Sequence, residues 1–159
     1  MHTMDDVVAA MREKARILYE GKQVPHRSCG MAIAETFDRD PRPYQALRRG
    51  GITGVGHCGA VVAGGLVLGE VFGYPDAAAP VSIALRDAMT RYQGEVAKRL
   101  PRGPGGTVVC NDLVSPFSDF QSDGRLLFCT MLTSTVAGIV AGIILELGGK
   151  LEPTPIRES

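Results

Sequence analysis

The sequence lacks a net charge, because its 17 Lys and Arg residues balance 17 Asp and Glu residues. A partner such as nucleic acid or an anionic membrane surface requires an excess of basic residues. The balance therefore argues against both. The chain also lacks internal repeats, low-complexity tracts and a linker rich in Pro, Gly and Ser. We therefore expect its 159 residues to form one domain, 1–159.

The first 21 residues lack the features of a secretory signal. They start acidic and become basic, whereas a signal has a basic start, an apolar middle and a small-residue cleavage site. We therefore expect a cytoplasmic protein. In a reducing compartment, the four cysteines are expected to be thiols, thiolate ligands or a catalytic pair rather than permanent disulfides.

Two common site motifs are missing as well. No CxxC is present, so the usual thioredoxin-like and zinc-ribbon signatures are absent. The glycine-rich segment 50–56, GGITGVG, lacks the Lys and the Ser or Thr of a phosphate-binding loop, and no predicted strand precedes it. We therefore do not expect nucleotide binding. The segment is interpreted as a tight turn that brings the chain close to the helix start that follows.

The patterns that are present are helical. No segment shows sustained alternation of polar and apolar residues, so no strand is required and the predicted class is all-α. We expect a compact bundle of about five helices around a central glycine- and alanine-rich apolar helix. That central helix follows Cys58, carries Glu70 as its only charge and should be buried almost all round. The other predicted helices cover about 5–20, 28–39, 81–99 and 125–147, with a short helical segment within 107–114.

The last predicted helix contains twenty uncharged residues, 126–145, which is long enough to cross a membrane. Its four Ser and Thr residues and the lack of an aromatic belt favour a core helix instead. Gly138 and Gly142 are expected to let it lie against the face formed by Ala60, Gly64 and Gly65. Two such apolar helices in a short chain also indicate a homo-oligomer.

The cysteines are the strongest candidates for chemistry. Cys58 follows the glycine-rich loop and precedes an apolar helix, so its sulfur should lie at a helix N-terminus, where N–H groups and the helix dipole lower a thiol pKa. Cys29 has a similar first-turn position, and Cys110 and Cys129 also lie near predicted helix starts. The four sulfurs could therefore converge on one pocket, as the ligands of an iron–sulfur cluster or as a reactive dithiol.

The alternative reading of each cysteine is a small buried hydrophobic residue. His57 beside Cys58, and His26 three residues before Cys29, are candidate supporting groups that could donate protons or hydrogen bonds or serve as spare ligands. Gly56 and Gly59 flank His57 and Cys58 in the sequence and are included in the candidate site. Either histidine could equally be a partly exposed side chain beside a turn.

Together these residues resemble a known family. Cys29 at a helix start, Cys58 in GGITGVGHCGAVVAGG, and then Cys110 and Cys129 are similar to the small redox-active proteins named for four cysteines and a CGAxxG motif. The resemblance extends from about Ser28 to Leu147. It departs at one position, since alanine stands where the last glycine of the motif would fall and Gly64 follows one place later. A related domain occurs in split-Soret cytochromes, so the resemblance implies redox chemistry. Covalent haem does not carry over, because no CxxCH is present.

Three functions remain open from the sequence. The first is an electron-transfer protein whose four cysteines bind an iron–sulfur cluster, with an unidentified redox partner protein. The second is a thiol–disulfide oxidoreductase or redox sensor, with Cys58 as the attacking thiol and another cysteine resolving the mixed disulfide. The third is a non-catalytic oligomeric module whose cysteines are structural, with zinc or without metal. Whether the protein is an enzyme is left open.

Overall fold

The computed structural model describes residues 2–157, and over that range it is all-helical, which confirms the predicted class. No strand occurs among these residues, although an isolated bridge pairs His57 with Val109. The described chain forms six α-helices and one 3-10 helix. Their bounds are α1 Met4–Glu20, α2 Cys29–Thr36, η1 Arg42–Leu47, α3 Gly59–Phe72, α4 Ile83–Arg99, α5 Cys110–Val114 and α6 Asp123–Glu146.

Local capping explains where the long helices begin. Thr3 and Asp6 form a capping box at the start of α1, and Gly21 ends that helix with φ of 75°. Ser82 and Ser122 each accept a hydrogen bond from a first-turn N–H of α4 and α6. Ser28 occupies the same position before α2 without making such a bond. Its hydroxyl therefore does not cap the helix.

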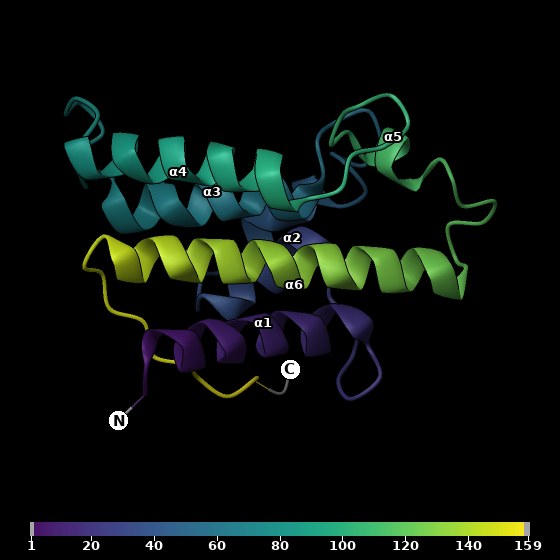
Figure 1. Ribbon diagram of the computed structural model, residues 1–159, viewed down its shortest axis with the longest axis horizontal. Coiled ribbons are helices and arrows are strands. Elements are labelled where there is room, and N and C mark those ends of the chain that lie inside the picture. The colour runs from purple at the N-terminus through teal and green to yellow at the C-terminus, as the bar shows by residue number, and fades with distance from the viewer. Residues whose placement is uncertain (1, 158–159) are drawn as a thin grey trace.

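The helix at the centre of the bundle is α6. Figure 1 shows it between α1 on one side and α3 with α4 on the other, and α2 also packs against it. The expectation that the helix after Cys58 would be central and buried almost all round is thus wrong. That helix, α3, is covered by α2, α4 and α6 but keeps one face in solvent, where Leu66 is 48% exposed.

The small residues of α3 and α6 do not pack against one another as expected. Gly138 lies against α1, where an added Cβ would come 2.8 Å from the Arg12 Cδ. Gly64 lies against α4, where an added Cβ would come within van der Waals overlap of the Tyr92 hydroxyl. That hydroxyl donates to the Val61 carbonyl. The glycines therefore make room for long side chains of the flanking helices rather than for close backbone contact.

By length and composition, α6 could cross a membrane, as the sequence indicated. In the fold, 67% of its most apolar 18-residue window is buried inside the protein. Fully buried side chains such as Val136, Val140 and Ile144 lie along it. Because its neighbours cover these side chains, α6 serves as the core helix of the bundle.

Candidate functional site: a four-cysteine cavity

All four cysteines line one cavity of about 410 Å³. Each is a free thiol. The cavity lies at the end of the bundle where α1 ends and α6 begins, close to α5 (Figure 1). Cys29 is the first residue of α2, Cys58 precedes α3, Cys110 is the first residue of α5, and Cys129 lies in the second turn of α6. Four segments that are distant in sequence thus bring their sulfurs to one space.

Backbone hydrogen bonds fix Cys58 and Cys110 relative to each other. The Cys58 N–H donates to the Val108 carbonyl at 2.8 Å, and the Cys110 N–H donates to the Gly56 carbonyl at 2.9 Å. The segment before α3 is thereby bonded to the segment before α5. Gly56 contributes to the site through this carbonyl.

The glycine-rich loop makes a left-handed turn beside the cavity. Arg49, Gly50, Gly51 and Ile52 all have positive φ, between 55° and 75°. A Cβ on Gly50 would come 2.5 Å from the Cys110 Cβ, so only glycine lets the loop approach this cysteine. Ile52 is a β-branched residue in a conformation that such residues rarely adopt. The turn places the Arg49 side chain at the cavity wall.

Gly59 provides a second close approach. A Cβ at this position would come 2.5 Å from the Leu47 carbonyl oxygen and 2.9 Å from the Cys29 Sγ. The start of α3 is therefore in contact with η1 and with the cysteine of α2. Gly59 also lines the cavity, which gives this candidate residue a packing role next to the sulfurs.

The cavity wall is positively charged. Arg48, Arg49 and Arg125 line it, and its lining contains no Asp or Glu. Arg49 Nη1 donates to the Cys110 sulfur at 3.1 Å and to the Asn111 side-chain oxygen at 2.9 Å. The guanidinium groups of Arg49 and Arg125 lie 4.7 Å and 3.9 Å from the centroid of the Phe120 ring. One aromatic ring therefore orients two cations toward the sulfurs.

Burial raises the pKa of the Cys110 and Cys129 thiols, because a thiolate is poorly solvated in this cavity. Arg49 opposes the shift at Cys110, and Arg125 opposes it at Cys129. Each arginine would compensate the charge of a thiolate beside it. The wall is therefore suited to hold negative charge on sulfur.

Cys29 and Cys58 form a coupled pair. A hydrogen-bonding interaction with Cys58 lowers the pKa of Cys29, and the same interaction together with burial raises the pKa of Cys58 well above its ordinary value. This order is opposite to the expectation that Cys58 is the low-pKa thiol. The helix N–H groups do favour a Cys58 thiolate, but its partner ionises first, and the second charge is then disfavoured.

The two candidate histidines have different positions. His26 lines the cavity, its Nδ1 contacts the Tyr19 carbonyl, and its ring packs edge-on against the Tyr19 ring at 4.8 Å between centroids. His57 does not line the cavity and instead faces a separate groove beside Tyr92 and Val96. Adjacency to Cys58 in the sequence did not place its side chain at the sulfurs, because His57 lies in an extended segment that pairs with Val109, and successive side chains of an extended segment point to opposite sides.

Several residues that line the cavity were not predicted from the sequence. Arg125 and Thr133 lie four residues before and after Cys129, so helical spacing alone places all three on one face of α6 and could have identified them. Tyr19 and Phe120 reach the cavity from α1 and from the loop before α6, and no local pattern indicates this.

Within residues 2–157, no three His, Cys, Asp or Glu side chains form a group that could hold a single metal ion. The four sulfurs instead lie around the cavity wall. No family model, curated protein or solved structure matches the chain.

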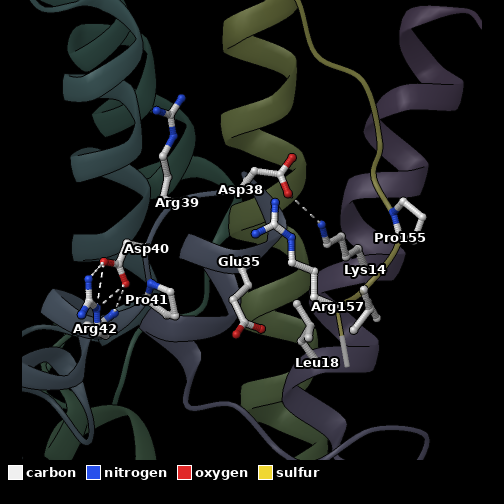
Figure 2. A pocket seen from close by; sticks show the side chains of 11 residues that line it. Lys14, Leu18, Glu35, Asp38, Arg39, Asp40, Pro41, Arg42, Pro155 and Arg157 are labelled. Carbon is white, nitrogen blue, oxygen red and sulfur yellow. Dashed lines mark hydrogen bonds and ion pairs between the residues drawn. The ribbon is translucent and has the colours of Figure 1, made fainter. Parts of the chain in front are cut away.

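A second cavity, of about 390 Å³, lies under the C-terminal segment (Figure 2). Two ion pairs, Lys14 with Asp38 and Asp40 with Arg42, lie at its wall. Buried Lys14 donates to the Thr154 hydroxyl at 2.9 Å and lies 3.6 Å from the Asp38 carboxylate, and Asp40 pairs with Arg42. These contacts attach the C-terminal segment to α1 and the end of α2. We interpret this cavity as a structural feature rather than as the reactive site.

Proposed function

We propose that the chain is a small redox protein in which Cys29, Cys58, Cys110 and Cys129 bind an iron–sulfur cluster that carries electrons. The observation that carries the proposal is that all four cysteines line one cavity. Cysteines that serve only as small buried hydrophobic residues have no reason to gather at one space. Four thiolates are the usual ligand set of [2Fe–2S] and [4Fe–4S] clusters.

The surroundings of the sulfurs fit such a group. A cluster held by four thiolates carries a net negative charge, and the wall offers three arginines with no carboxylate. Arg49 already donates to the Cys110 sulfur, and hydrogen bonds of this kind stabilise a reduced cluster. Leu113, Val114 and Leu132 supply an apolar lining that limits access of water.

When bound, the cluster would supply one-electron transfer. The chain's own residues then have separable tasks. The cysteines hold the group as thiolates, Arg49 and Arg125 compensate their charge, and Phe120 orients both arginines.

The test is an absorption spectrum with iron, sulfide and zinc analysis of protein purified without oxygen, repeated on Cys58→Ala. The proposal predicts iron with matching sulfide and a visible absorption band that the substitution abolishes. Ser115→Ala is a suitable control, because this exposed hydroxyl follows α5 and donates to the Asp112 carbonyl. Colourless, metal-free protein after anaerobic purification and reconstitution would reject the cluster. Zinc alone would favour the structural module.

A second function is favoured by the placement of Cys29 and Cys58 at the wall of one cavity, where Gly59, the residue after Cys58, packs against the Cys29 sulfur. In a thiol–disulfide reaction, the Cys29 thiolate attacks a substrate disulfide, and one substrate sulfur leaves as a thiolate that takes up a proton. Cys58 then loses its proton and attacks Cys29, which releases the second substrate thiolate. The substrate gains two electrons, and a Cys29–Cys58 disulfide remains for an external dithiol to reduce.

This alternative assigns the attacking role to Cys29 and the resolving role to Cys58, in the reverse of the sequence-based order. It predicts metal-free protein that reduces a small disulfide. Cys29→Ser should abolish that activity, whereas Cys58→Ser should trap a mixed disulfide on Cys29, visible by mass spectrometry. Iron and sulfide in the anaerobic wild-type protein would contradict it.

Assembly and location are further parts of the proposal. Leu127 and Met131 are 64% and 48% exposed and lie one turn apart on α6, which supports contact between two copies of the chain.

We place the protein in the cytoplasm, where free thiols persist and a redox partner protein can reach the end of the bundle that holds the cysteines.

A further inference from the structure

Among residues 2–157, two hydroxyl groups at the cavity wall have no hydrogen-bond partner. Thr133 is fully buried at 0% exposure, lines the cavity and leaves its Oγ1 unpaired among the described residues. The Ser28 Oγ lines the same cavity and is buried and unpaired in the same part of the chain. A buried hydroxyl without a partner is destabilising, so each such group calls for an explanation.

Thr133 differs from the neighbouring hydroxyls of its own helix. Thr130 donates to the Leu126 carbonyl at 2.7 Å, and Thr135 donates to the Met131 carbonyl at 2.8 Å, each four residues back. The equivalent acceptor for Thr133 is the carbonyl of Cys129, to which it does not donate. Its position four residues after Cys129 places it on the face of α6 that carries that cysteine.

Ser28 differs from the other serines that precede helices. Ser82 and Ser122 accept first-turn N–H groups at 3.0 Å and 3.2 Å, whereas Ser28 makes no such bond. Its hydroxyl is adjacent to Cys29 in the chain. Both unpaired hydroxyls are therefore neighbours, in sequence or along a helix, of a proposed cluster ligand.

We propose that the Thr133 and Ser28 hydroxyls donate hydrogen bonds to sulfur atoms of the bound cluster and so raise its reduction potential. This inference rests on the proposed cluster and assigns two positioning residues to it. A donor aimed at sulfur stabilises the more negatively charged, reduced form, so loss of the donor shifts the potential to more negative values.

The test compares Thr133→Val with Thr130→Val by voltammetry of anaerobically reconstituted protein. Both threonines are buried on α6, and valine preserves the shape of either side chain. We expect a more negative midpoint potential for Thr133→Val, the wild-type value for Thr130→Val, and recovery of the wild-type value in Thr133→Ser. Ser28→Ala should shift the potential in the same direction as Thr133→Val.

A second readout separates this role from a structural one. Without a cluster, Thr133→Val removes an unpaired hydroxyl and should unfold at a urea concentration equal to or above that of the wild type, whereas Thr130→Val loses a formed hydrogen bond and should unfold earlier. An unchanged midpoint potential in cluster-containing Thr133→Val would overturn this inference. Earlier unfolding of metal-free Thr133→Val than of the wild type would also overturn it. Neither result would affect the proposal that the protein binds a cluster. Wild-type protein that takes up no iron overturns the proposed function, which iron analysis detects before any potential is measured.

Discussion

Arg49 donates a hydrogen bond from Nη1 to the sulfur of Cys110 at 3.1 Å. The two residues are 61 positions apart, and the left-handed turn at residues 49–52 brings the arginine to the cavity. A cation at hydrogen-bond distance favours the thiolate over the thiol. It therefore opposes the rise in the Cys110 pKa that burial causes.

Replacing Arg49 with Gln should raise the pKa of Cys110 further, because burial then acts unopposed. In metal-free protein, the midpoint of the pH profile for Cys110 alkylation, followed by mass spectrometry, should move up by about one pH unit. Arg48→Gln is the matched control, since Arg48 lines the same cavity and contributes nothing to the Cys110 shift. Equal profiles for the two variants would show that the Arg49 contact does not stabilise the thiolate.

Gly59→Ala should destabilise the fold and displace Cys29, because the new methyl group would come 2.5 Å from the Leu47 carbonyl oxygen and 2.9 Å from the Cys29 Sγ. We expect a loss of about 1–3 kcal/mol in the free energy of unfolding, measured by urea denaturation. Gly69→Ala in the same helix meets no atom within 4 Å. It should be neutral or stabilising by about 0.5–1 kcal/mol. Similar losses in both variants would refute the close approach at Gly59.

Cys29 should react before Cys58 in metal-free protein. The interaction between the two thiols lowers the pKa of Cys29 and raises that of Cys58, so the Cys29 thiolate forms at lower pH. Iodoacetamide at pH 7 should therefore label Cys29 several-fold faster than Cys58. In Cys58→Ala the hydrogen-bonding partner is lost, and the alkylation profile of Cys29 should move to higher pH. Faster labelling of Cys58 in the wild type would reverse the order of the pair.

Asp112 should stabilise the fold at neutral pH and lose this effect in acid. Its carboxylate accepts hydrogen bonds from the Gly105 N–H, the Thr107 N–H and the Thr107 hydroxyl, which lower its pKa below the ordinary 3.8. Between the two pKa values the unfolded chain binds more protons, so this contribution is complete above the ordinary pKa and disappears as the pH falls through the folded one.

The comparison that checks this is urea denaturation of the wild type and Asp112→Asn at pH 7 and at about pH 2 to 3. Asp112→Asn should unfold earlier at pH 7, and the difference should shrink at the lower pH. Because Asp112 lies two residues after Cys110, the substitution should also make the position of Cys110 less well fixed. A difference that persists unchanged in acid would assign the loss to something other than the carboxylate.

Much of the helical architecture could be predicted from the sequence, because its signals are local. The apolar face from Met11 to Leu18, Gly21 after α1 and the Ser122 cap of α6 each act within a few residues. The central role of α6 could not be predicted in the same way. It depends on which helices cover which face, and α3 and α6 are both apolar enough to compete for the centre.

The sequence identified part of the candidate site. Positions near helix starts identified the four cysteines as candidates to share a pocket, but spacing alone carries no information on tertiary convergence. The error at His57 has the same origin, since adjacency in the chain does not fix side-chain direction. Arg49 and Phe120 act through contacts between distant segments, which only the folded structure reveals.

Four cysteines from four segments are the ligands of the proposed cluster. The most direct test is crystallography of anaerobically reconstituted protein with diffraction data collected on both sides of the iron absorption edge. We expect one iron-specific anomalous peak inside the cavity, bonded to the sulfurs of Cys29, Cys58, Cys110 and Cys129. An iron peak elsewhere, or a cavity without iron beside a Cys29–Cys58 disulfide, would contradict it.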